Sequence, residues 1–143
     1  MNGAVRPGVL LMTYGSPASL GRADIRAYLA RVRGGREPEP DLVDEFSRRY
    51  RLTGGSPLVE IARSQAAALA DALGWPVEIG MRFSEPSIEA GLRGLLDAGV
   101  DHAAGIILSP QYSPLLMGGY ARAVDAAGTA LGDVAPHVSM AGT

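Results

Sequence analysis

Residues 8–13, GVLLMT, form an uninterrupted apolar run that ends abruptly at Tyr14 and Gly15. A continuous apolar run of this length is typical of a β-strand covered on both faces, as in a parallel sheet. Three later segments have the same character: PVEIGMRF at 76–83, AAGIILSP at 103–110 and APHVSM at 135–140. The sequence therefore predicts four buried strands, and a sheet of this kind needs helices to cover it.

Helical patterns separate these four strands. Ile25, Tyr28, Leu29 and Val32 recur at helical spacing in a segment that ends at Gly34. Further helices are predicted from about Asp41, from Pro57, over 86–99 and over 118–131. The other buried positions expected in the second, third and fourth helices are Val43, Phe46, Tyr50, Leu58, Ile61, Ala62, Leu69, Leu73, Ile88, Leu92, Leu95 and Leu96. This alternation predicts an α/β fold: a four-stranded parallel sheet with helices on both faces and right-handed crossovers.

The 143 residues are predicted to form one domain, 1–143, because 47% of them are apolar and no linker or repeat interrupts the pattern. The chain has no cysteine, which excludes disulfides and thiolate metal sites within it. A net charge of −2 argues against a general nucleic-acid binder. No apolar run approaches the roughly 20 residues of a membrane span and no signal peptide precedes the first strand, so we expect a cytoplasmic protein.

The carboxyl ends of the strands are the predicted ligand edge, because ligands collect there in open parallel sheets. Tyr14, Ser84 and the loop from Pro110 to Gly119 meet at this edge. The loop contains the apolar run Leu115, Leu116 and Met117. These side chains either cap the core or form a wall for a flat apolar ligand.

Arginines accompany this edge, and all 13 basic residues of the chain are arginine. Arg33 lies at the end of the first predicted helix and Arg36 follows it directly, and Arg48 and Arg49 lie on the second predicted helix. Such a cluster is either a solvated face or a set of carboxylate ligands, since the arginine fork binds carboxylates with two hydrogen bonds. Together with apolar walls and tyrosines, it suits a planar ligand that carries carboxylates.

Five segments carry a resemblance: LLMTYGSP, RGGREPEP, RYRLTGGSPL, GMRFSEPSI and LSPQYSPLLMGGY. In this order they resemble the N-terminal half of the ferrochelatases, in particular the bacterial coproporphyrin ferrochelatases of actinobacterial type. The resemblance implies a chelatase-like lobe of an enzyme that inserts ferrous iron into coproporphyrin III on the route to haem. It implies no built-in cofactor, with iron as a substrate and the tetrapyrrole as the partner molecule.

The same resemblance assigns site residues. Tyr14 matches a tyrosine that approaches the iron of the bound product as an axial ligand, which makes it the catalytic and metal candidate of this chain. Tyr14 is also one of the residues that match tetrapyrrole-binding positions, and the other five are Arg33, Arg49, Tyr50, Ser56 and Tyr120. Ser56 is in GGSP, which is one residue shorter than the GGxSP of some family members.

Metal insertion also needs a group that removes the pyrrole protons, and histidine and carboxylate suit this role. The chain has two histidines, His102 and His137, and neither matches a catalytic position of the family. His102 is expected at the surface and His137 in a structural role. In the family, the metal-binding histidine and glutamate belong to a second, C-terminal lobe, which we expect to be absent from this chain.

Three hypotheses follow for function. The chain is one lobe of a coproporphyrin ferrochelatase, a tetrapyrrole-binding module without turnover, or a homodimeric small chelatase for another tetrapyrrole. The small chelatases carry HGS at the end of the first strand, whereas this chain has YGS, and phenol is a poor proton acceptor at neutral pH. A lobe without its partner is also expected to expose an apolar face and to self-associate.

Overall fold

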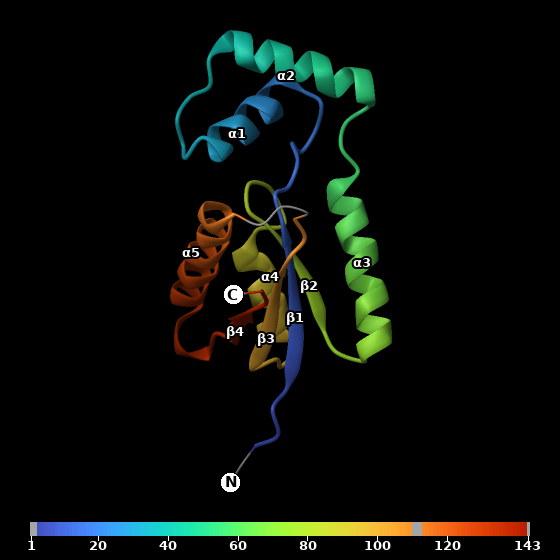
Figure 1. Ribbon diagram of the computed structural model, residues 1–143, viewed down its shortest axis with the longest axis vertical. Coiled ribbons are helices and arrows are strands. Elements are labelled where there is room, and N and C mark those ends of the chain that lie inside the picture. Colours follow the sequence, from blue (N-terminus) through green and yellow to red (C-terminus); the bar gives the residue numbers. More distant parts are fainter. Residues whose placement is uncertain (1–2, 110–112, 143) are drawn as a thin grey trace.

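The computed structural model describes residues 3–109 and 113–142. Its four strands form one parallel sheet in the order β2-β1-β3-β4 (Figure 1). In chain order the elements are β1 (Pro7–Thr13), α1 (Arg22–Val32), α2 (Pro40–Thr53), α3 (Leu58–Leu73), β2 (Val77–Met81), α4 (Ile88–Asp97), β3 (His102–Ile107), α5 (Pro114–Leu131), a 3-10 turn (Gly132–Val134) and β4 (His137–Met140). The predicted α/β fold with a four-stranded parallel sheet is confirmed.

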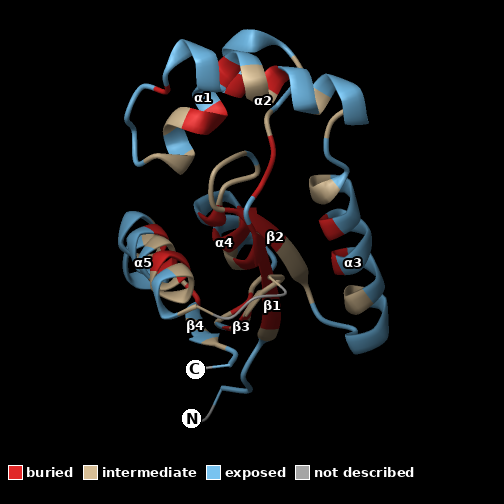
Figure 2. Cartoon of the chain, turned by 45° about the horizontal axis from the view of Figure 1, so that its top comes forward, coloured by how far each residue is buried: buried red, intermediate tan, exposed pale blue. Residues whose placement is uncertain are grey.

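The central strand β1 is buried from both sides, as its apolar run predicts. Leu10 and Met12 are 0% exposed and pack with residues of α4 and α5. Val9 and Leu11 point to the opposite face and pack with Ala62 of α3. Figure 2 shows the buried strand with α3 on one side and α4 and α5 on the other. Helices on both faces therefore explain why the run contains no polar alternation.

The helices α1 and α2 are placed differently from the other three. They pack against each other beyond the carboxyl ends of the strands, at the top of Figure 1, and form what we call the α1–α2 cap, residues 22–53. Ile25, Tyr28, Leu29 and Val43 are its buried core. Phe83, which follows β2, packs against this core and joins the cap to the sheet. The cap therefore stands directly over the predicted ligand edge.

The buried stripe of α3 differs from the prediction. Ile61 is 49% exposed and Leu73 is 41% exposed, although both were expected to be buried. The residues that face the sheet are centred instead on Ala62 and Ala66, which are 1% and 7% exposed. These small side chains allow the helix to lie close to the strands, so larger residues on the adjoining positions are left at the surface. In α4, Leu96 is half-buried.

The helix α5 begins at Pro114, four residues before the predicted start, because proline is favoured in the first turn of a helix. Ser113 caps it by accepting a hydrogen bond from the amide of Leu116. Leu115, Leu116 and Met117 therefore lie in the first helical turn, so the prediction that they belong to a loop is wrong. Leu115 is 81% exposed, whereas Leu116 packs against the core. The first part of the predicted loop, 110–112, lies outside the described residues.

Candidate functional site

Tyr14 lies at the carboxyl end of β1, where the backbone leaves the sheet. Its carbonyl accepts a hydrogen bond from the amide of Phe83 at 3.0 Å, and the carbonyl of Thr13 accepts one from the amide of Arg82 at 3.0 Å. These bonds continue the pairing of β1 with β2 beyond the strand ends. The Tyr14 ring meets the Phe83 ring edge-on, with centroids 4.7 Å apart and planes at 63°. These contacts fix the position of Tyr14. The residue is nevertheless 38% exposed, so part of it faces solvent.

The turn after Tyr14 depends on glycine. Gly15 has φ of +104°, a conformation that other residues rarely adopt, and a Cβ there would lie 2.2 Å from the Ser84 hydroxyl oxygen. The same hydroxyl accepts a hydrogen bond from the amide of Ser16 at 3.1 Å. Tyr28 of the cap donates a hydrogen bond from its hydroxyl to the carbonyl of Gly15 at 3.4 Å. The loop after β1 is thus held by the loop after β2 and by the cap.

Arg82 connects the two ring systems of this edge. Its guanidinium lies over the Phe83 ring, 4.7 Å from the centroid, and 5.7 Å from the centroid of the Tyr120 ring. A Cβ on Gly119 of α5 would lie 2.4 Å from the guanidinium carbon, so any side chain there would displace the Arg82 guanidinium from this position. Within the described part of the chain, no hydrogen bond or ion pair involves the Arg82 side chain. A half-buried, unpaired cation therefore lies next to Tyr14's ring partner.

Tyr120 lies inside the core, with only 1% of its surface exposed. Burial raises the pKa of Tyr120 to about 12, against the opposing effect of Arg82. The structure thus places Tyr120 behind Arg82 and not at the open surface of the edge. Its role in tetrapyrrole binding remains a prediction from the resemblance.

Three predicted site residues lie on the cap. Arg33 follows the last turn of α1 and is half-buried. Arg49 of α2 is exposed, and its Nε donates to Glu45 Oε1 at 2.9 Å. Hydrogen bonds from Arg48 and then Arg49 lower the pKa of Glu45 to about 2.

Tyr50, the next residue of α2, is held by stacking. Its ring lies parallel to that of Phe46, with centroids 4.5 Å apart and planes at 21°. Burial raises the pKa of Tyr50. The aromatic pair thus gives α2 a stacked side chain next to the exposed guanidinium of Arg49, which is paired with Glu45.

Ser56 lines a pocket of about 390 Å³ between the cap and the sheet. The pocket is formed by the loops after β1 and β2, by α1 and by the start of α3. Its lining residues are Ser16, Pro17, Ala18, Asp24, Ala27, Tyr28, Arg31, Ser56, Val59, Glu60, Ser84 and Glu85. The structure therefore brings Ser56 to the expected edge, but none of Tyr14, Arg33, Arg49, Tyr50 and Tyr120 lines the same pocket.

Both histidines lie at the amino ends of their strands, away from Tyr14. His102 begins β3 and pairs in register with His137 of β4, and their ring centroids are 5.5 Å apart. Both are exposed, and His102 Nδ1 lies 3.0 Å from Asp101 Oδ1. Within residues 3–109 and 113–142, no group of three or more His, Cys, Asp or Glu side chains is arranged to hold a metal ion.

Arg82 and Phe83 were missed as site residues, although their segment, GMRFSEPSI, carried part of the resemblance. Both directly follow the strand-like run that ends in Met81. A charged residue at the carboxyl end of a parallel strand points to a ligand edge, and this signal was available in the sequence. The contact of Arg82 with Gly119 could not be predicted from the sequence, because these two residues lie far apart in the chain.

The ferrochelatase family model matches residues 6–140 of this chain. The chain is 43% identical over 126 residues to the ferrochelatase of Deinococcus radiodurans, covering 84% of this chain and 39% of that protein. It is 34% identical over 133 residues to the coproporphyrin III ferrochelatase of Geobacillus kaustophilus, covering 87% and 42%. The coproporphyrin III ferrochelatase 1 of Bacillus cereus is 30% identical over 138 residues, with 91% and 44% covered.

The chain belongs to the ferrochelatase family, a family of enzymes that insert metal into tetrapyrroles, and the predicted resemblance is confirmed. It spans about two fifths of the length of these relatives. Among the helices of the described residues, none combines the length and apolar character that crossing a bilayer requires.

Proposed function

We propose that this chain is the N-terminal, tetrapyrrole-binding lobe of a cytoplasmic ferrochelatase that inserts ferrous iron into coproporphyrin III. The supporting observation is the placement of Tyr14, which is held edge-on against Phe83 at the carboxyl edge of the sheet and keeps part of its ring in solvent. Two of the three relatives described above are named as coproporphyrin III ferrochelatases, which supports this substrate.

The chemistry of the substrate fits the residues gathered at this edge. A tetrapyrrole is a rigid apolar disc with carboxylates on its rim, so it needs a flat wall and cations around it. In the proposed site Tyr14 approaches the iron from one face of the disc. Arg33 and Arg49 of the cap bind carboxylates, and Tyr50 and Ser56 add hydroxyl groups, while Tyr120 stabilises the edge through Arg82.

Insertion requires the loss of two pyrrole protons and the delivery of a partly dehydrated metal ion. His102 and His137 lie at the opposite edge of the sheet, so we assign neither of them to this step. We propose that a second lobe supplies the metal-binding histidine and glutamate, as the resemblance implies. Iron is then a substrate, and the reaction uses no resident cofactor.

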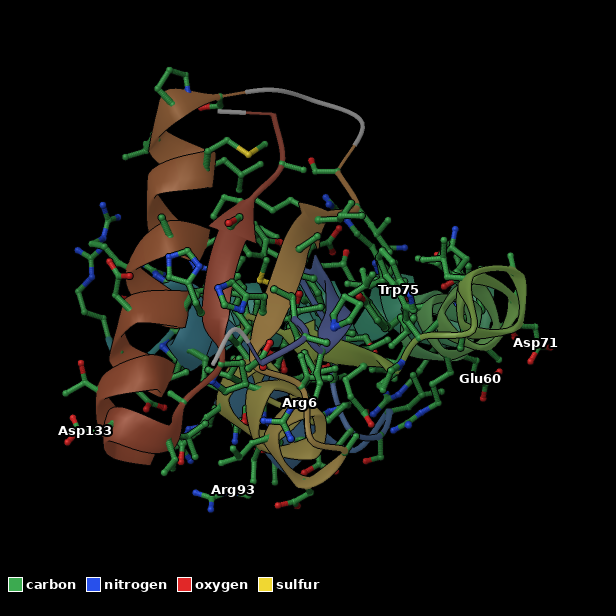
Figure 3. The ribbon with its side chains drawn as sticks, turned by 90° about the horizontal axis from the view of Figure 1, so that it is seen from below. Arg6, Glu60, Asp71, Trp75, Arg93 and Asp133 are labelled. Atoms are coloured by element: carbon green, nitrogen blue, oxygen red, sulfur yellow. The ribbon has the colours of Figure 1, made fainter. Side chains whose placement is uncertain are left out.

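An anaerobic absorbance titration with coproporphyrin III tests this proposal. We expect the chain to shift and sharpen the porphyrin band on binding, and Arg33→Ala to weaken binding about tenfold through loss of a charge-assisted hydrogen bond. Arg93→Ala on α4 is the matched control, because it removes the same charge from an exposed helix away from the carboxyl edge. Figure 3, seen from below, shows the Arg93 side chain pointing outward from the molecule. If Arg33→Ala and Arg93→Ala change the affinity for coproporphyrin III equally, the assignment of Arg33 is wrong.

Iron coproporphyrin III then tests the role of Tyr14. With Tyr14 as axial ligand, the bound complex has a charge-transfer band that Tyr14→Phe removes while the phenyl ring still fills the site. Ferrous iron added to the porphyrin complex is expected to insert no faster than in a protein-free control. Acceleration by this chain would contradict the second-lobe assignment. Acceleration that rises with the fraction of dimer would support a homodimeric chelatase, because self-association without acceleration is also expected of an isolated lobe.

A further inference from the structure

A second pocket lies on the α1–α2 cap, outside the residues assigned above. It has a volume of about 420 Å³ and is lined by Arg22, Asp44, Ser47, Arg48, Arg51 and Leu52. Three guanidinium groups and one carboxylate therefore surround it. Arg22 is the first residue of α1, so the positive end of that helix dipole also lies beside the pocket.

Ser47 is an unusual member of this lining. The residue is 4% exposed, and its hydroxyl oxygen is buried without a hydrogen-bond partner, the one such side-chain atom in the described part of the chain. A serine within a helix commonly bonds to the carbonyl four residues earlier, and buried hydroxyls are nearly always satisfied. Ser47 lines the pocket, so a rotation of its side chain would turn the hydroxyl toward an acceptor atom bound there and give it the partner that the protein does not supply.

The arginine side chains of the pocket are free to bind such an acceptor group, or can be released to do so. Arg22 pairs with Asp44, and Arg48 pairs with Glu45, but all four side chains are exposed. Exposed ion pairs of this kind are weak and exchange readily with other partners. The Arg51 side chain has no ion pair or hydrogen bond with any residue that the structure describes. The pocket thus holds one unpaired cation and two that can be redirected.

We propose that this pocket binds an oxyanion, either a carboxylate or a phosphate. Arg51 and Arg48 provide charge-assisted hydrogen bonds, and the Ser47 hydroxyl donates to the same group. The exposed side chain of Leu52 contacts any apolar part of the ligand. Free phosphate is one source of such a group; a rim carboxylate of the tetrapyrrole is the other, and that source alone rests on the function proposed above.

Isothermal titration of the whole chain with inorganic phosphate, in a low-salt buffer without other oxyanions, tests the proposal. We expect one phosphate per chain. Arg51→Ala is expected to weaken binding about tenfold, the loss of one charge-assisted hydrogen bond. Arg63→Ala, which removes an exposed arginine from α3, is the matched control and is expected to change affinity less than twofold.

Two further variants separate a ligand site from a merely basic surface. Ser47→Ala removes the unpaired hydroxyl, so it is expected to weaken phosphate binding severalfold without lowering the urea midpoint of unfolding. Asp44→Asn releases Arg22 and is expected to strengthen binding a few fold. Absence of saturable binding, equal effects of Arg51→Ala and Arg63→Ala, or unchanged affinity in Ser47→Ala would each overturn the proposal.

Coproporphyrin III distinguishes the two sources of the oxyanion. If the pocket receives a tetrapyrrole carboxylate, phosphate competes with coproporphyrin III and Arg51→Ala weakens both ligands. If the pocket is a separate phosphate site, Arg51→Ala weakens phosphate alone. Saturable phosphate binding in a chain that does not bind coproporphyrin III would support the pocket and refute the proposed function, so the two failures are distinguishable.

Discussion

The sheet and the α1–α2 cap are held together by different means. The sheet has two apolar clusters, one on each face of β1, and its largest side chains are completely buried. The cap has a single small cluster around Val43 and Ile25, and its outer faces are tied by exposed ion pairs such as Arg26 with Glu37. Since burial of apolar surface is the dominant stabilising term, the sheet is the stable body and the cap the weaker element.

The predicted site residues are divided between the stable sheet and the weaker cap. Tyr14 and Arg82 belong to the sheet, whose strand pairing fixes them. Arg33 and Arg49 belong to the cap, where Arg33 is half-buried and Arg49 is exposed in a surface ion pair with Glu45. We infer that the sheet positions the face of the tetrapyrrole, where small displacements matter, and that the cap binds the flexible carboxylates on its rim.

Among the variants that test this comparison, Leu10→Ala is expected to change the free energy of unfolding most. Leu10 is 0% exposed at the centre of β1, so the change leaves a cavity and lowers the free energy of unfolding by about 2–5 kcal/mol. Urea unfolding followed by circular dichroism measures it. Leu52→Ala, at a position 74% exposed, is the control and should cost under about 0.5 kcal/mol. A loss below about 1 kcal/mol for Leu10→Ala would contradict the assignment of the sheet as the stable body.

Alkaline pH tests the burial of Tyr120 within the same body. Its pKa is raised to about 12, whereas tyrosine in the unfolded chain ionises near pH 10. Below pH 10 its contribution to stability is complete, and it is lost as the pH rises toward 12, because the unfolded state alone releases the proton. The full contribution is about 2–3 kcal/mol by this difference in pKa.

Urea unfolding at pH 8, 10 and 11.5 follows this loss. Burial also raises the pKa of Tyr28, so the wild-type chain is expected to lose stability steadily above pH 10. Tyr120→Phe should reduce the dependence on pH in this range, since phenylalanine does not titrate. An identical pH profile in the variant would show that Tyr120 is accessible to solvent.

Val43→Ala addresses the cap alone. Val43 is 2% exposed in the cap core, and its truncation is expected to cost about 1–2 kcal/mol. If the cap opens independently of the sheet, amide exchange speeds up roughly tenfold in α1 and α2 but not in β1. Equal acceleration in β1 would show that the cap and the sheet unfold as one unit.

The sequence predicted the fold where its patterns are local. The run at 8–13 is a strand with both faces covered, and the turn after it requires Gly15, as the abrupt end of the run indicates. The stripe on α3 was misplaced at Ile61 because periodicity does not show that Ala62 faces the sheet. Small residues give a weak hydrophobic signal even where they make the closest contact.

The site could be predicted only in part, for a related reason. The position of Tyr14 follows from strand order alone, because the end of a central parallel strand is a fixed place in the fold. The contact of Arg82 with Tyr120 and Gly119 depends on how the first turns of α5 dock at the carboxyl edge of the sheet, which is a tertiary property. Packing likewise decides that α1 and α2 form a cap over the carboxyl edge, while the other helices cover the faces of the sheet.

Glu45→Gln is expected to have the smallest effect on stability and a specific effect on binding. Glu45 is engaged by Arg48 and Arg49 on an exposed face, so its removal should leave the urea midpoint at pH 7 unchanged. Its pKa of about 2 means that this pairing is present above pH 4.5 and is lost as the pH falls toward 2.

Because Glu45→Gln frees Arg49, the proposed tetrapyrrole site predicts a two- to threefold gain in affinity for coproporphyrin III, within the range of an exposed charge pair. Glu89→Gln on α4, which breaks the corresponding exposed pair with Arg93, is the matched control and should leave affinity unchanged. If Glu45→Gln lowers the affinity, Glu45 orients Arg49 toward the ligand instead of competing for it. The cap would then be a preorganised part of the site, like the sheet, and the division between a positioning body and an adaptable cap would be wrong.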